Sequence, residues 1–159
     1  MTRTLILLRH AKSAWPEDTP DAARPLAARG LRDAPAVGRW LRAQVPKIDC
    51  VLCSPAVRAA QTWDLAAVQL AAMPRVSHDE RLYGASAHEL LTVTQELPRG
   101  ASTAVLVGHN PGLEDFLTLL TGVDEVLKTS AIAVTTTPLS WEQSRPGSWT
   151  MAALVTPRG

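Results

Sequence analysis

The chain has 159 residues and a mass of 17.1 kDa, which is the size of one ordinary domain with a sizeable core. Its 16 Lys and Arg against 15 Asp and Glu give a formal net charge of +1. This balance argues against nucleic-acid binding through bulk electrostatics and against a polybasic membrane-surface protein. Hydrophobic residues make up 46% of the chain and charged residues 19%, which excludes an intrinsically disordered protein.

The apolar runs and the cysteines exclude further classes of protein. No apolar run approaches the roughly 20 residues that cross a bilayer, and the run at 5–8 is too short for a signal peptide. The two cysteines, Cys50 and Cys53, exclude a disulfide framework. Because residues three apart on a strand face opposite sides, we interpret them as core residues and not as a redox or zinc pair. We therefore expect a cytoplasmic protein.

Short apolar runs alternate with longer amphipathic stretches, a pattern typical of an α/β sandwich. The apolar runs predict strands over the ranges 4–8, 49–53, 104–107, 131–136 and 149–155, and an extended or strand segment over 76–82. Apolar residues at helical spacing predict helices near 37–45, 56–73, 90–97 and 113–120. Residues 16–30, rich in proline and charge, predict an exposed loop. Pro55 suits the first turn of the helix after the second strand, with Ser54 as its cap.

Polar side chains follow three of the predicted strands. Arg9 and His10 come directly after the first strand, Arg58 lies one turn into the helix after the second, and His109 follows the strand at 104–107. Because the carboxyl ends of parallel strands lie along one edge of a sheet, we expect these four side chains to converge there.

The chemistry of this set favours phosphate. Arginine presents a planar fork of donors that matches phosphate oxygens, and histidine can act as a nucleophile that forms a covalent intermediate. Phosphoryl transfer needs mainly positioning and charge neutralisation. No acidic cluster with Mg²⁺-type spacing accompanies the set, so the arginines would neutralise the phosphate and we expect neither a metal nor a cofactor. A single arginine or histidine of this kind is usually structural, whereas the joint placement of four predicts a site.

These residues lie in segments that resemble motifs of the histidine phosphatase superfamily, which is also called phosphoglycerate mutase-like. The segments are Arg9-His10-Ala11, Ser54-Pro55 with Arg58 and Thr62, and Gly108-His109. Alanine at position 11 replaces the commoner glycine. Within the superfamily the chain looks most similar to the short, SixA-like phosphohistidine phosphatases, on the further segments Arg24-Pro25-Leu26, Leu82-Tyr83-Gly84-Ala85-Ser86 and Asn110-Pro111-Gly112.

The resemblance implies a single histidine phosphatase domain over 1–159, folded as a three-layer α/β/α sandwich with a mostly parallel central sheet. It implies that His10 is the nucleophile and becomes phosphorylated. Arg9, Arg58 and His109 would then form the phosphate pocket, with His109 stabilising the phosphoryl group during its transfer. The implied activity is that of a metal-independent phosphatase.

The general acid is a separate question. Glu80 resembles the glutamate that protonates the leaving group in the mutases, and a solvated loop carboxylate is the alternative interpretation. Asp79 and His78 are adjacent polar candidates. A phosphoramidate leaving group is protonated more easily than an alkoxide, so the short branch can manage without a clear acid.

Chain length bears on the substrate. The chain is shorter than the mutases and has little room for a lid between the second and third strands. An open pocket suits phosphohistidine on a protein. A phosphomonoesterase acting on a small sugar or nucleotide phosphate is the alternative, and a phosphate-binding module without turnover is a third possibility. The oligomeric state is left open by the sequence.

Overall fold

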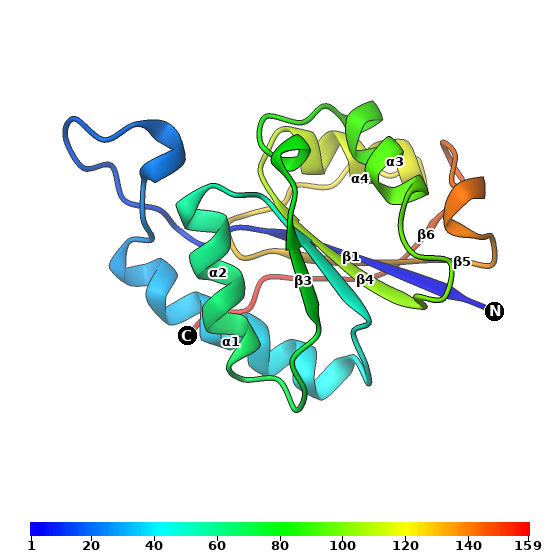
Figure 1. Ribbon diagram of the computed structural model, residues 1–159, viewed down its shortest axis with the longest axis horizontal. Coiled ribbons are helices and arrows are strands. Elements are labelled where there is room, and N and C mark those ends of the chain that lie inside the picture. Colours follow the sequence, from blue (N-terminus) through cyan, green and yellow to red (C-terminus); the bar gives the residue numbers. More distant parts are fainter.

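The computed structural model describes all 159 residues as one six-stranded sheet with helices on both faces (Figure 1). The strand order is β3-β2-β4-β1-β5-β6. The first four strands in this order run parallel, and β5 and β6 are antiparallel to their neighbours. The strands are β1 (Arg3–Arg9), β2 (Cys50–Cys53), β3 (Arg75–His78), β4 (Thr103–Gly108), β5 (Ile132–Thr137) and β6 (Thr150–Val155).

Two pairs of helices cover the sheet. α1 (Ala28–Gln44) and α2 (Val57–Ala67) pack together on one face, and α3 (Ala87–Gln95) and α4 (Gly112–Thr121) pack together on the other (Figure 1). Three short 3₁₀ helices complete the chain: η1 (Asp21–Ala23), η2 (Glu80–Leu82) and η3 (Trp141–Gln143). The predicted three-layer sandwich with a mostly parallel sheet is confirmed. None of the helices is long and apolar enough to cross a membrane.

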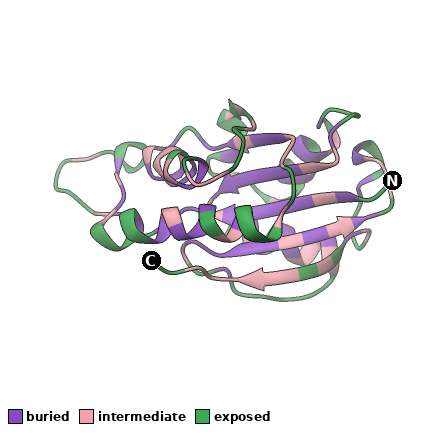
Figure 2. Cartoon of the chain, turned by 90° about the horizontal axis from the view of Figure 1, so that it is seen from below, coloured by how far each residue is buried: buried purple, intermediate pink, exposed green.

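Strand β1 shows why its sequence is a continuous apolar run. Leu5 and Leu7 belong to the core beneath α3 and α4, whereas Ile6 and Leu8 belong to the core beneath α1 and α2. All four side chains are fully buried, and Figure 2 shows buried colour along the central strands. Burying such a side chain stabilises the fold by about 1.5–3 kcal/mol. The apolar cores therefore hold β1 in place on both faces and fix the position of the polar residues that follow it.

The two cysteines lie on opposite faces of the sheet. Cys50 packs in the core beside α3 and α4, and Cys53 packs in the core beside α1 and α2. Burial raises the pKa of the Cys53 thiol to about 12. They are core residues, as their spacing predicts.

The predicted loop over 16–30 is wrong at its end. Helix α1 already begins at Ala28, and Leu26 and Gly30 are buried. A Cβ atom added at Gly30 would lie 2.1 Å from the carbonyl oxygen of Lys12. This glycine therefore marks a close approach between the first turn of α1 and the segment after β1, and not a break in the helix.

Three other boundaries also differ from the predictions. Helix α2 ends at Ala67 and not near residue 73, and Val68 directly after it is exposed. The segment 76–82 divides into the end of β3 and the helix η2. Ser54 is not a helix cap: α2 begins at Val57 with Ala56 at the N-cap, and the Ser54 hydroxyl instead contacts His109.

Candidate active site

Three parallel strands end side by side at one edge of the sheet. Arg9 at the end of β1 pairs with Gly108 at the end of β4, and Cys53 at the end of β2 pairs with Val107. The pairing continues one residue further, because the His10 amide donates to the Gly108 carbonyl at 3.1 Å. Polar residues that follow these strands are therefore held at the same edge.

His10 is buried and its ring orientation is fixed. Its Nδ1 lies 2.7 Å from the carbonyl oxygen of Ala11. A carbonyl only accepts hydrogen bonds, so Nδ1 carries the proton and Nε2 keeps its lone pair. Burial lowers the pKa of His10 to about 3, and the positive charges of Arg58 and Arg9 act in the same direction. At neutral pH the imidazole is uncharged, which is the form that a nucleophile needs.

His109 lies next to His10, with their ring centroids 5.1 Å apart. Its Nε2 is 2.7 Å from the hydroxyl of Ser54, and its Nδ1 is buried without a hydrogen-bond partner. Burial, followed by the charge of Arg58, lowers the pKa of His109 to about 4. This ring therefore offers a second polar nitrogen beside His10.

Both arginines contribute donors to the same cluster. Arg9 donates from Nη1 to the carbonyl of Leu127 at 2.9 Å, and Arg58 donates from Nη1 and Nη2 to Asp21 at 2.7 and 3.0 Å. The Nε atom of each guanidinium is buried and has no partner in the protein. Both charges lower the pKa of both histidines. The structure thus brings together Arg9, His10, Arg58 and His109, which the sequence places far apart.

Glu80 lies outside this cluster. It is the first residue of η2, and its exposed side chain makes no hydrogen bond or ion pair. Asp79 is paired with Arg81 at 2.8 Å, and His78 is exposed on β3. The assignment of Glu80 as a general acid stays a prediction.

Three residues at the site were not found by sequence reasoning. The carboxylate of Asp21 accepts hydrogen bonds from Arg58, from Arg24 at 3.1 Å and from the hydroxyl of Tyr83. These partners, Tyr83 first, hold the pKa of Asp21 well below its usual range. The Tyr83 ring in turn meets the His109 ring edge-on, with centroids 5.6 Å apart. Arg24 and Tyr83 stand in segments that carry the family resemblance, but their link through Asp21 is a feature of the folded chain.

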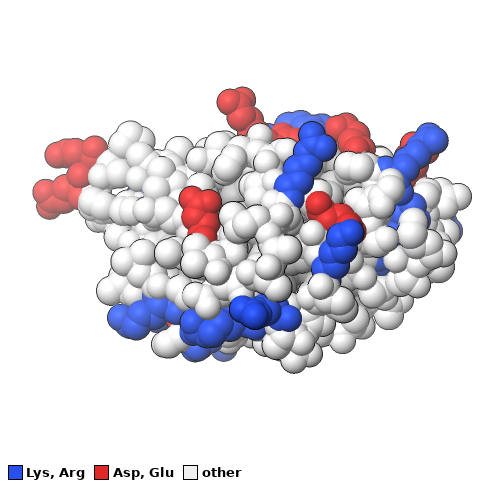
Figure 3. All heavy atoms as spheres, turned by 60° about the horizontal axis from the view of Figure 1, so that its bottom comes forward, with Lys and Arg blue, Asp and Glu red and all other residues white.

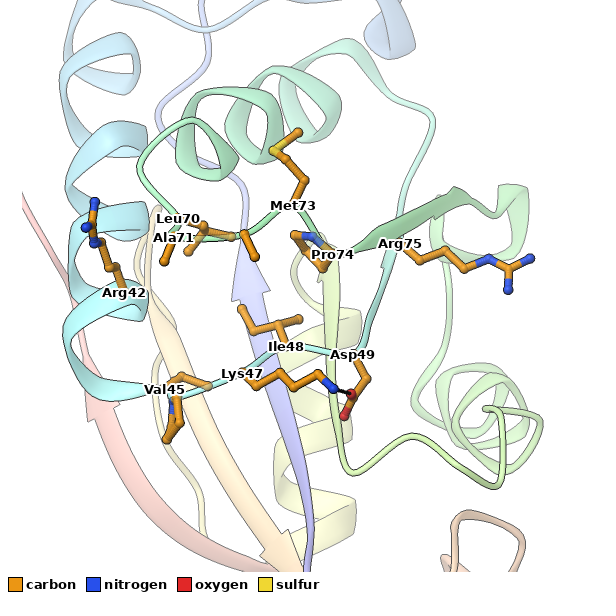
Figure 4. Close-up of a pocket in the computed structure, with 12 residues that line it drawn as sticks. Arg42, Val45, Lys47, Ile48, Asp49, Leu70, Ala71, Met73, Pro74 and Arg75 are labelled. Atoms are coloured by element: carbon orange, nitrogen blue, oxygen red, sulfur yellow. Dashed lines mark ion pairs between the residues drawn. The ribbon is translucent and has the colours of Figure 1, made fainter.

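A pocket of about 340 Å³ lies elsewhere, between the C-terminal end of α1 and the segments that enter β2 and β3 (Figure 4). Its lining is half apolar, and it contains no histidine. Lys47 in its wall pairs with Asp49 at 3.5 Å. Figure 3 shows a face on which charges of both signs are scattered, with one group of basic side chains along its lower edge. No group of three or more His, Cys, Asp or Glu side chains is placed to hold a metal ion.

The sequence-family model of the histidine phosphatase superfamily (branch 1) matches residues 5–99 of this chain, a range that contains Arg9, His10 and Arg58. The chain belongs to this superfamily. An uncharacterized protein of Mycobacterium tuberculosis is 38% identical over 162 residues, which cover 95% of this chain and 100% of that protein. A second relative from Mycobacterium leprae is 32% identical over 165 residues, again covering 95% of this chain and 100% of the relative.

Solved structures place the chain within the SixA-like branch. SixA from Nakamurella multipartitia is 28% identical, and it superposes with a TM-score of 0.89 over 99% of this chain and 97% of its own. The protein histidine phosphatase SixA in complex with tungstate has the same fold, with 24% identity and a TM-score of 0.84 over 97% of both chains. A mycobacterial glucosyl-3-phosphoglycerate phosphatase shares the fold at 14% identity, with a TM-score of 0.70 over 96% of this chain and 98% of its own. The chain is therefore a phosphatase of the SixA-like branch, a hydrolase that acts on phosphate groups.

Proposed function

We propose that this phosphatase removes phosphate from phosphohistidine on a protein, through a covalent intermediate at His10. One observation carries the proposal. A buried, uncharged imidazole with its Nδ1 proton fixed on a carbonyl lies in the field of two guanidinium groups, each with a buried Nε–H that has no partner in the protein. A phosphoryl group supplies the oxygen acceptors that such donors need.

The reaction has two steps. In the first, the lone pair of His10 Nε2 attacks phosphorus, a P–N bond forms, and the bond from phosphorus to the leaving nitrogen breaks. The leaving nitrogen keeps the electron pair and takes a proton. In the second step water attacks phosphorus, the bond to Nε2 breaks and returns its electron pair to the ring, and inorganic phosphate leaves. Arg9 and Arg58 neutralise the phosphoryl oxygens in both steps.

His109 would act as a hydrogen-bond donor to the transferring group. The Ser54 hydroxyl oxygen accepts from the Ala56 amide at 3.2 Å, so its own hydrogen is available to the Nε2 atom of His109 at 2.7 Å. With the hydroxyl as donor to Nε2, the imidazole proton lies on Nδ1, the buried nitrogen without a partner. A donor fixed in advance at this position stabilises charge that develops on the phosphoryl oxygens.

The connections around the site favour a protein substrate. Between the end of β2 and the start of β3 the chain holds α2 and short connections, with no inserted lid domain. A phosphohistidine side chain on another protein could reach such a site from solvent. Its imidazole leaving group is protonated readily, which agrees with the exposed position of Glu80.

One observation favours a small phosphate ester as the second candidate. The segment between β1 and α1 contains Asp21, which accepts a hydrogen bond from Arg58. This segment therefore forms a wall at one side of the site. Walls of this kind can enclose a small sugar or nucleotide phosphate. The two candidates differ in which substrate is turned over efficiently.

The test compares phosphate release from a phosphohistidine-containing protein with release from a panel of sugar and nucleotide phosphates. We expect the phosphoprotein to give the higher kcat/KM, and His10→Ala to abolish turnover of every substrate. His88→Ala, at an exposed position on α3, is the matched control and should leave turnover unchanged. Undiminished turnover by His10→Ala would refute the mechanism. A higher kcat/KM for one small ester would assign that ester class instead, and phosphate binding without turnover would identify a binding module.

The role of Glu80 has its own test. If its carboxyl group protonates the leaving group, Glu80→Gln should slow the hydrolysis of alkyl phosphates far more than that of phosphohistidine, because an alkoxide needs the proton more. Glu142→Gln, at an exposed position in η3, is the control. Equal rates for Glu80→Gln and the wild type on both substrate types would show that Glu80 is a solvated carboxylate.

A further inference from the structure

Asp21 holds the outer edge of the Arg58 guanidinium in two ways at once. Its main-chain carbonyl accepts from Nη1 at 2.7 Å, and its carboxylate oxygen Oδ2 accepts from Nη2 at 3.0 Å. The two bonds join one residue of η1 to one residue of α2, and they occupy the edge of the guanidinium formed by its two Nη atoms. The Arg58 side chain is only 7% exposed, so few other arrangements are open to it.

The remaining edge of Arg58 is the one that suits a phosphoryl group. A guanidinium has five N–H donors, and its Nε–H runs parallel to one hydrogen of the neighbouring Nη2. Arg58 Nε is buried without a partner, and the charge of this group acts on both His10 and His109. An edge with two parallel donors matches two oxygens of a phosphoryl group.

We propose that Asp21 is a positioning residue, which fixes the outer edge of Arg58 so that its Nε edge faces the phosphoryl group. This inference rests on the proposed function, because it assigns the Nε edge to the substrate phosphate. Removal of the Asp21 side chain would leave the Arg58 guanidinium free to rotate and would weaken its hydrogen bonds to the phosphoryl oxygens.

The alternative is that Asp21 competes with phosphate for Arg58, as a carboxylate that must leave when substrate enters. The contacts favour positioning. The Asp21 carboxylate is also bound by Arg24 through Oδ1 at 3.1 Å and by the Tyr83 hydroxyl through Oδ2. Arg24 is itself anchored on Ser13 at 2.9 Å. A carboxylate held by three side chains, two of them from distant parts of the chain, is poorly placed to move away at each turnover.

The experiment measures the affinity for orthovanadate, an oxyanion of phosphate shape, by titration calorimetry, and kcat and KM for phosphohistidine hydrolysis. We expect Asp21→Ala to weaken vanadate binding about tenfold or more, the loss typical of a charge-assisted hydrogen bond. Asp21→Asn keeps an oxygen acceptor for Arg58 and should recover part of the affinity. Glu17→Gln is the matched control, because it removes one negative charge from an exposed side chain of the same segment that makes no hydrogen bond or ion pair.

A double-mutant cycle separates positioning from a general structural effect. In an Arg58→Lys background, Asp21→Ala should have little further effect on vanadate affinity, because the guanidinium that Asp21 holds is gone. If Asp21→Ala binds vanadate as tightly as Glu17→Gln does, the inference is overturned. If Asp21→Ala binds vanadate more tightly than the wild type, Asp21 is a competitor of phosphate. If the wild type binds vanadate but shows no turnover, the proposed function fails while the affinities still decide the role of Asp21. If the wild type binds no vanadate, both fail.

Discussion

Thr62 connects the two segments that carry the central site residues. Its hydroxyl oxygen accepts a hydrogen bond from the Ala11 amide at 2.9 Å, next to His10, and its hydrogen is donated to the Arg58 carbonyl at 2.7 Å. The side chain is fully buried. Thr62→Val conserves the shape of the side chain but leaves the Ala11 amide buried without an acceptor.

The expected cost follows from that orphaned amide. A buried donor left without a partner costs about 1–3 kcal/mol, and we expect Thr62→Val to lower the free energy of unfolding by that amount. The site should respond as well, because Ala11 carries the carbonyl that orients His10. We expect kcat to fall more than KM rises.

Urea denaturation and steady-state kinetics measure the two effects. Thr94→Val is the matched control: Thr94 is also fully buried, but its hydroxyl only donates to the Leu90 carbonyl within α3, so no amide loses its acceptor. Thr62→Ser should restore most of the stability. The reasoning is refuted if Thr62→Val and Thr94→Val have the same stability and the same kcat.

Two further predictions concern pH and packing. The pKa of His10 is lowered from 6.5 to about 3 and that of His109 to about 4, so the unfolded chain binds more protons than the folded chain below pH 6.5. The free energy of unfolding should therefore be highest above about pH 6.5 and fall as the pH drops toward 3, with a smaller loss in His10→Asn. Urea denaturation at a series of pH values measures this dependence. A free energy of unfolding that does not change with pH over this range would contradict it. A Cβ atom at Gly38 of α1 would lie 2.1 Å from the Ala66 carbonyl oxygen of α2, so Gly38→Ala should destabilise the protein by about 1–3 kcal/mol. Gly100→Ala meets nothing within 4 Å and serves as the control in thermal unfolding, where equal melting temperatures would contradict the packing argument.

The parts of the fold that could be predicted are those in which the physical signal is local. Leu5 to Leu8 form a run that is apolar on both faces of a strand, and this run alone predicts a buried parallel strand. The apolar spacing of α4 likewise predicts its position. The polar residues after the strands were predictable as a cluster, because parallel strands align their carboxyl ends.

The parts that could not be predicted depend on contacts between distant segments. Gly30 resembles a helix breaker in the sequence, yet it lies inside α1, where the nearby Lys12 carbonyl leaves no room for a Cβ atom. Ser54 reads as a helix cap, yet its hydroxyl contacts His109, which is 55 residues away in the chain. Asp21 is one carboxylate among several in a proline-rich segment. Its position against Arg58 follows from the packing of η1 on α2, which has no local sequence signal.

The most direct measurement is the detection of a phosphorylated enzyme. The protein is mixed with a phosphohistidine-containing substrate, quenched under alkaline conditions within its first turnovers, digested and examined by mass spectrometry. We expect one phosphoryl group on the peptide that contains His10, stable in base and labile in acid as a P–N bond is, and none in His10→Ala. Phosphate release at full rate without any adduct on that peptide, or with an adduct on another residue, would contradict a mechanism centred on His10.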